Sequence, residues 1–199
     1  MAQTTQKYIF SEILKKGSQR GIYPGKTQAA ANWYREQAQS FSNISRNRLL
    51  GERSQMRNSI VPGSMYMFAY SAKHKDTLPY YDAFPIIFPV EMYGDGFLGI
   101  NFHYLQPILR AKLFDALYGL VSDPKLTDKA KIQLSYQMLR GFSRYKYFQP
   151  CLKRYLYSQF RSKFVYVSPD TWDIALFLPT ENFQGATKNQ VWMDSRNVV

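Results

Sequence analysis

The chain contains few of the residue types that most metal and redox sites need. Its 199 residues include one cysteine, Cys151, and two histidines, His74 and His103. A single cysteine excludes an intrachain disulfide and a multi-cysteine metal site. The two histidines are too far apart in the sequence to form the HxxxH spacing that holds zinc on one helix. We therefore expect neither a metal nor another bound cofactor.

Common catalytic and phosphate-binding motifs are also missing. The sequence has no GxSxG motif and no GxxxxGKS/T motif, which would mark a serine nucleophile and a phosphate-binding loop. The glycines of GDGFLG, at residues 94–99, fall between two predicted strands and precede no helix. A tight turn explains them better than phosphate binding does.

Four carboxylates lie in the central part of the sequence: Asp76, Asp82, Glu91 and Asp95. A metal-dependent nuclease needs such groups to converge on Mg²⁺, whereas these four stand at irregular spacing in predicted loops. Asp82 is expected to cap a turn, and His103 to lie in the core or to form a hydrogen bond. We expect no enzymatic activity, and a nuclease is the weaker alternative.

No stretch has the apolar character of a membrane segment or a signal peptide. The sequence contains no apolar run of about 18 residues or more, the length that indicates a transmembrane helix. The first ten residues, MAQTTQKYIF, lack the apolar region of a signal peptide. We expect no membrane partner and a chain made in a cytosol-like compartment.

Aromatic residues, by contrast, are abundant. The 16 tyrosines, 14 phenylalanines and 3 tryptophans make up 17% of the chain. Tyrosine and tryptophan provide large, stiff contact areas in protein interfaces, so this composition fits a chain that buries much surface against partners. A small aromatic-rich core explains it equally well.

The chain is strongly basic, with a formal net charge of +12. Residues 1–62 hold 10 Lys or Arg against 3 Asp or Glu, residues 63–124 hold 4 against 6, and residues 125–199 hold 12 against 5. The positive charge therefore flanks a nearly neutral centre. Two basic flanks suit contact with phosphates or with acidic faces of other proteins. A solvated basic surface is the alternative.

Residues 1–62 do not have the pattern of a compact domain. Helices are predicted over residues 8–16 and about 28–39, but glycines and a proline interrupt the chain between them. The remainder is polar and basic, with isolated large apolar residues that are too sparse to build a core. We predict an extended, partly helical arm that lies in grooves of neighbouring subunits and is anchored by Trp33, Tyr34, Phe41, Leu49, Leu50 and Met56.

Residues 63–183 are predicted to form one α+β domain. Strand-like patterns occur at residues 64–72, 84–90, 97–105 and 163–167. Pro85 and Pro89 restrict the second of these to an edge strand or a bent strand, and YGDG at residues 93–96 indicates a hairpin turn. The strands predict a small bent antiparallel sheet or an SH3-like barrel.

Helices are predicted to follow and to pack on this sheet. One begins at Pro107, and a second is capped by Thr127 and ends near Phe142. A further short helix is expected after Ser168. Residues 184–199 are predicted to be a polar C-terminal tail.

The basic, aromatic run at residues 140–163 is the strongest nucleic-acid candidate in the sequence. Lys and Arg can neutralise phosphates there, while tyrosine rings can stack on bases. The candidate contacts to DNA or to an acidic partner are Arg140, Arg144, Lys146, Lys153, Arg154 and Arg161. The alternative is an amphipathic structure, including a short helix after Pro150 through Phe160, whose charges face water or acidic neighbours.

Two segments resemble a known family. Residues 62–118 and 170–183 are similar to virion-associated proteins of T-even-like and related contractile-tailed bacteriophages. The similarity in the first segment is carried by LPYYD (78–82), GFLGINFHYL (96–105) and RAKL (110–113). The resemblance implies a component of the phage particle and brings no catalytic residues with it.

The leading hypothesis from the sequence is therefore a structural protein of a phage virion. We expect it in the tail baseplate or hub, where extended arms would link it to other virion proteins in a multi-subunit assembly. The alternative is a DNA-binding protein at the packaged genome end, or a head-completion or neck protein.

Overall fold

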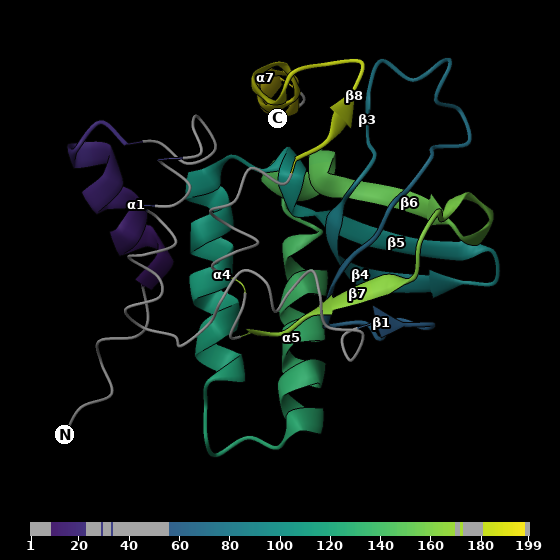
Figure 1. Cartoon of the computed structure of the whole chain (residues 1–199). Coiled ribbons are helices and arrows are strands. Elements are labelled where there is room, and N and C mark those ends of the chain that lie inside the picture. The colour runs from purple at the N-terminus through teal and green to yellow at the C-terminus, as the bar shows by residue number, and fades with distance from the viewer. Residues whose placement is uncertain are drawn as a thin grey trace.

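The structure is a computed structural model that describes residues 9–22, 29, 33, 56–169, 172 and 181–197. It has an α+β fold in which helices pack on a mostly antiparallel sheet (Figure 1). The predicted fold class is thus confirmed.

Six antiparallel strands form the main sheet in the order β1-β7-β2-β4-β5-β6. These strands are β1 (Met56–Arg57), β2 (Met65–Met67), β4 (Ile86–Tyr93), β5 (Gly96–Asn101), β6 (Leu152–Leu156) and β7 (Phe164–Val167). In the described part of the chain β1 and β6 remain the two edges, so the sheet is open and is not the SH3-like barrel that was the second possibility. A separate pair joins β3 (Tyr81–Asp82) to β8 (Phe183–Gln184).

The predicted hairpin connects β4 and β5. Tyr93 pairs with Gly96, so Gly94 and Asp95 form the turn. The prolines do not place β4 at an edge, because the strand lies between β2 and β5. Instead the pairing with β5 shifts register between Pro89 and Glu91, and such a bulge accommodates a proline inside a sheet.

Two long helices, α4 (Pro107–Val121) and α5 (Asp128–Phe142), follow the first strands. Pro107 occupies the first helical turn of α4, where its missing N–H costs nothing. The Thr127 hydroxyl accepts a hydrogen bond from the Ala130 N–H and caps α5. Both helix starts agree with the sequence-based prediction.

Two further α-helices and three short 3₁₀ helices complete the described architecture. Helix α1 (Ile9–Gln19) packs beside α4, and helix α7 (Lys188–Asn197) lies beyond β8 (Figure 1). The 3₁₀ helices are η2 (Phe102–Tyr104), η3 (Lys146–Cys151) and η4 (Tyr157–Gln159).

The alternation of side chains along each strand builds two cores, one on each face of the sheet. In β2, Met65 and Met67 face the core shared with the helices, whereas Tyr66 belongs to the second core. The second core consists largely of aromatic rings packed edge to face around Phe68. Many of the aromatic residues thus pack in the interior of this chain.

Large apolar side chains of the strands and of α4 fill the two cores. Tyr66, Phe68, Phe88, Phe97, Phe102, Leu113 and Leu117 are all in the two cores. Leu98 and Leu109 are partly buried against the first core.

The described parts of the predicted arm contact the rest of the same chain. Ile13 and Leu14 of α1 are buried in the first core, and Trp33 packs against it. Met56 lies in β1, paired with Val165 of β7, and its side chain is exposed. Tyr34, Phe41, Leu49 and Leu50 lie outside the described residues. Binding of these side chains to neighbouring subunits remains a prediction.

The segment predicted as a C-terminal tail contains helix α7. Val191 of this helix is completely buried, and the Trp192 indole N–H donates a hydrogen bond to the His103 carbonyl, 2.8 Å away. The helix predicted after Ser168 falls almost entirely outside the described residues. Trp172, which is described, is buried beside Phe88 and Phe114.

The helix predicted after Pro150 is wrong. Residues 152–156 form strand β6, which pairs with β5 along its whole length. The positions of Leu152 and Leu156 fit helical spacing, but Tyr155 is the residue that enters the aromatic core, beside Phe97. Short apolar runs do not distinguish a strand from a helix by periodicity alone.

Among the residues that the structure describes, no helix combines the length and the apolar character needed to cross a lipid bilayer.

Candidate nucleic-acid interface

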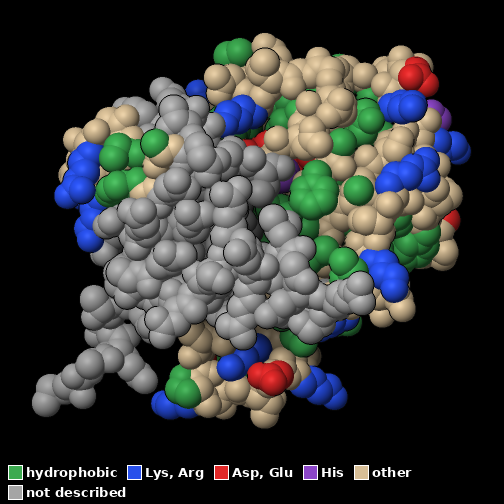
Figure 2. Space-filling model, viewed as in Figure 1, with side chains coloured by type: hydrophobic (Ala, Val, Ile, Leu, Met, Phe, Trp, Pro, Cys, Tyr) green, Lys and Arg blue, Asp and Glu red, His purple; other side chains and the backbone are tan. Residues whose placement is uncertain are grey.

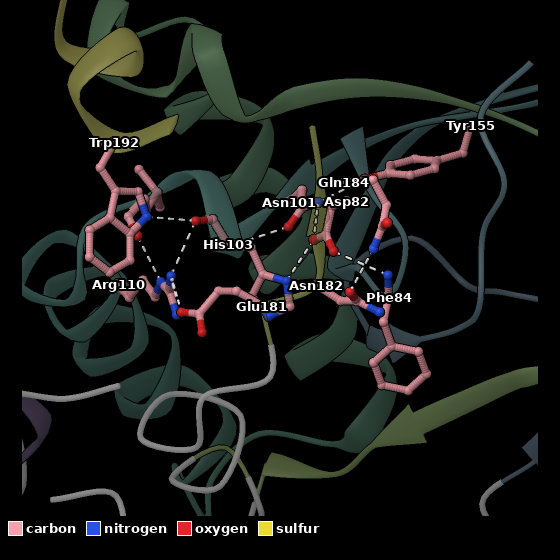
Figure 3. Close-up of polar contacts among 11 residues, drawn as sticks. Asp82, Phe84, Asn101, His103, Arg110, Tyr155, Glu181, Asn182, Gln184 and Trp192 are labelled. Atoms are coloured by element: carbon pink, nitrogen blue, oxygen red, sulfur yellow. Dashed lines mark hydrogen bonds and ion pairs between the residues drawn. The ribbon is translucent and has the colours of Figure 1, made fainter. Parts of the chain in front are cut away.

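A buried polar network joins the end of β5 to β3. The Asp82 carboxylate accepts hydrogen bonds from His103 Nδ1 at 2.6 Å, Asn101 Nδ2 at 2.9 Å and the Phe84 N–H at 3.1 Å (Figure 3). Asn101 also donates to the Tyr155 hydroxyl, 3.0 Å away. Asp82 therefore does more than cap the turn at Phe84, since it also orients one side chain at the end of β5 and one in η2.

A second buried pair continues the network toward α4 and α7. The Arg110 guanidinium lies 2.6 Å from the Glu181 carboxylate and donates to the carbonyls of His103 and Leu105. Trp192 of α7 donates to the same His103 carbonyl (Figure 3). Both ion-pair partners are almost completely buried, so the network ties α4, α7 and η2 together.

The carboxylates of this network are held in their charged form. Burial by itself raises the pKa of Asp82. The charge of His103 and the hydrogen bonds from His103, Asn101 and the Phe84 N–H outweigh this effect, so the pKa of Asp82 falls. Burial likewise raises the pKa of Glu181, while Arg110 and His103 bring it down to about 2. The network therefore has a structural role, because its two carboxylates already bind protein hydrogen-bond donors.

Beside Asp82, the surface opens into a pocket of about 400 Å³. Its walls come from β6, from the connection between β2 and β3, and from η2. The aromatic wall consists of Tyr70, Tyr80, Tyr81, Tyr104 and Tyr155. The cationic wall consists of Lys73, Lys153 and Arg154, with His74 beside them. We call this cavity the tyrosine pocket.

The fold fixes most of the tyrosines before any ligand arrives. The Tyr155 hydroxyl accepts a hydrogen bond from Asn101, and the Tyr70 hydroxyl accepts one from the Leu156 N–H. The Tyr80 hydroxyl bonds to Asp194 of α7. Tyr80 and Tyr81 are only half-buried, so each presents aromatic surface to the pocket.

Strand β6 contributes two adjacent basic residues to the pocket lining, and their charged groups make different contacts. Lys153 pairs with Gly99 of β5, and its ammonium lies 4.1 Å from the centre of the Tyr104 ring. Arg154 forms an exposed ion pair with Asp95 and lies 4.1 Å from the centre of the Tyr93 ring. Both contacts are favourable cation–π arrangements.

Lys153 differs from Arg154 in having no compensating carboxylate. In the described ranges, no Asp or Glu forms an ion pair with its ammonium. Burial lowers the pKa of Lys153, and the nearby Cys151 only partly opposes this effect. A desolvated cation that lacks a counterion is favourable for binding an anion.

The other predicted cations do not line the pocket. Arg140 lies in the last turn of α5, and Arg144, Lys146 and Arg161 are exposed on the segments that follow. Lysine and arginine side chains are spread along the side of the molecule that carries the strand ends and the β2–β3 connection (Figure 2). The basic run at residues 140–163 had indicated Lys153, Arg154 and the tyrosines of that run, which include Tyr155. It had not indicated Tyr70, Tyr80, Tyr81 and Tyr104, which come from two other regions of the chain.

The four central carboxylates do not form a metal site. In the part of the chain that the structure describes, no three His, Cys, Asp or Glu side chains come together in a way that could hold a metal ion. Asp82 is used in the buried network, and Asp95 in the hairpin turn pairs with Arg154.

Cys151 should be chemically inert in the folded protein. Its side chain is completely buried, and burial raises the pKa of the thiol to about 12, although Lys153 and Arg110 act in the opposite direction. At about pH 8 we expect iodoacetamide to alkylate Cys151 only after unfolding in guanidinium, as measured by intact mass. Equal labelling rates in the native and unfolded protein would contradict this burial.

Comparison with known proteins gives one match. A family model described as phage T4 terminal DNA protecting protein matches residues 10–195. No curated protein and no solved structure matches the chain significantly. The match agrees with the expected T4-like phage origin of the family, but its description refers to DNA and not to a baseplate. Since the matched residues span nearly the whole chain, this protein belongs to the phage T4 terminal DNA protecting protein family.

Proposed function

We propose that this protein binds the ends of linear phage DNA and shields them from nucleases. The observation that carries the proposal is the family match over residues 10–195. It favours the alternative reached from the sequence, a DNA-binding protein at the genome end, over the leading hypothesis of a baseplate or hub component. Baseplate location is accordingly not part of the proposal.

The charge distribution supports a phosphate-rich partner. The chain has a net charge of +12, and its described cations include exposed residues on β6 and on the segments after α5. Contacts between such side chains and phosphates provide most of the non-specific affinity of proteins for DNA. The tyrosine pocket adds aromatic surface on which an exposed base can stack.

The proposal includes no reaction carried out by the chain itself. Asp82 and His103, the pair that most resembles an acid–base dyad, are buried, and the Asp82 oxygens accept hydrogen bonds from protein groups. A general base has to reach the proton that it removes. Protection would therefore come from occupancy of the DNA end.

A nuclease-protection assay tests the proposal. A linear duplex and a nicked circle of the same sequence are incubated with the protein. An exonuclease that can begin digestion either at a duplex end or at a nick is then added. We expect the linear DNA to survive and the nicked circle to be degraded, because only the former has duplex ends. Protection should also weaken as salt rises. Equal protection of both DNAs would indicate general coating, and loss of both would refute DNA-end protection.

We further propose that the protein is a virion component that stays with the packaged DNA. Family membership supports this location, and other phage proteins are then expected as partners. Quantitative mass spectrometry of purified particles should detect the chain at a constant copy number per genome. Its complete removal by washing intact particles would contradict this location.

A further inference from the structure

The tyrosine pocket has the size of a site for one nucleotide. Its volume of about 400 Å³ lies near the lower end of the range of roughly 300–1,000 Å³ that small-molecule sites occupy. A base pair within a continuous duplex cannot enter such a cavity, because its neighbours are stacked on both sides. A nucleotide at a chain end is stacked on one side only and can enter once its terminal base pair opens.

The chemistry of the walls matches the two parts of a nucleotide. Tyr80 and Tyr81 are half-buried and present aromatic surface, to which a base can stack. Lys153 provides an ammonium without a carboxylate partner among the described side chains. Asp82 is the acidic residue in the wall, and its charge is already engaged by His103 and Asn101.

The charge of the phosphate distinguishes a terminal from an internal position. A phosphodiester inside a strand carries one negative charge. A terminal phosphomonoester carries about −1.5 to −2 at neutral pH and has three acceptor oxygens. The desolvated Lys153 ammonium, with Lys73 at the same pocket, therefore favours the terminal group.

From these observations we propose that the tyrosine pocket receives the 5′-phosphorylated terminal nucleotide of a DNA end, with its phosphate at Lys153 and its base against Tyr80 or Tyr81. This inference rests on the proposed function and specifies which chemical group at the end is recognised. Tyr104, whose ring lies under the Lys153 ammonium, would be a positioning residue for that lysine.

The test measures binding to hairpin-closed duplexes that have a single open blunt end. One duplex carries a 5′-phosphate at that end and the other a 5′-hydroxyl, and fluorescence anisotropy gives the two dissociation constants. We expect the 5′-phosphate end to bind about tenfold or more tightly than the 5′-hydroxyl end. This factor corresponds to the free energy that one charge-assisted hydrogen bond to a phosphate contributes. A phosphorylated end whose terminal nucleotide lacks its base should bind about fivefold or more weakly than the complete end, because it loses stacking.

Three variants connect this preference to the pocket. Lys153→Met keeps most of the side-chain volume and should abolish the preference for the 5′-phosphate, whereas Lys153→Arg keeps the charge and should retain it. Lys125→Met removes an exposed cation from the α4–α5 connection, at the end of α4 and α5 away from the β2–β3 connection (Figure 1), and should behave like the natural protein. Thermal melts show whether each variant is folded.

The outcomes separate this inference from the proposed function. If the natural protein protects linear DNA but binds both ends equally, the proposed function stands and the phosphate-specific pocket is refuted. A folded Lys153→Met variant that retains the preference would also refute it. Equal binding of the abasic and complete ends would refute entry of the base. Absence of both binding and protection would overturn the proposed function itself.

Discussion

Replacing Phe68 with alanine is expected to destabilise this protein more than any other single truncation in the second core. Phe68 is completely buried, and its ring lies 4.7 Å from that of Phe160 and 5.4 Å from those of Tyr155 and Phe164. Truncation of a buried phenylalanine costs about 3–5 kcal/mol. The cost should fall at the upper end because these three rings come from β6, from the connection between η4 and β7, and from β7, and cannot all move into the cavity.

Urea denaturation followed by circular dichroism measures this loss. Tyr145→Ala is the matched control, because it also removes an aromatic ring but the side chain is 62% exposed. We expect the control to change the free energy of unfolding by less than about 0.5 kcal/mol. If Phe68→Ala and Tyr145→Ala had equal effects, the second core would not contribute to stability as its geometry implies.

Removing the charge of Glu181 should produce the second large effect. Glu181→Gln leaves the buried Arg110 guanidinium without its carboxylate, and breaking a buried ion pair in this way costs about 3–5 kcal/mol. The same pair makes stability depend on pH. The folded-state pKa of Glu181 is about 2, against a reference value of 4.5.

The direction of this pH dependence follows from the lowered pKa. The carboxylate stabilises the fold fully above about pH 4.5, and this contribution is lost as pH falls from 4.5 toward 2. The difference in unfolding free energy between the natural protein and Glu181→Gln should therefore be largest at neutral pH and shrink below about pH 4.5. Asp76→Asn, at an exposed carboxylate, is the control and should change the free energy of unfolding by less than about 0.5 kcal/mol. A Glu181→Gln difference that stays constant down to about pH 3 would contradict the role of the ion pair.

Local signals in the sequence were sufficient to predict where several helices and turns lie. Pro107 and Thr127 determine where α4 and α5 begin, since one residue fits the first helical turn and the other supplies a capping oxygen. The YGDG turn produced the β4–β5 hairpin. Each of these depends on contacts between residues a few positions apart, so the sequence alone could predict them.

The candidate site depended on contacts between distant residues. Asp82 and His103 are 21 positions apart, with no motif that connects them. Residues 152–160 could be read as a helix because their apolar positions satisfy both periods, and only pairing with β5 makes residues 152–156 a strand. That pairing is what brings Lys153 to the pocket.

The sequence by itself determined that the chain is basic, aromatic and α+β, and which cations were available to meet a phosphate. Tertiary structure decided that five tyrosines and Lys153 share one cavity, that the Asp82 carboxylate beside it is already hydrogen-bonded, and that α7 packs against the domain. The physical reason is that local patterns are set by steric and hydrogen-bonding preferences within a few residues. Convergence of the pocket residues is instead set by strand register and by burial of two cores, to which the whole chain contributes.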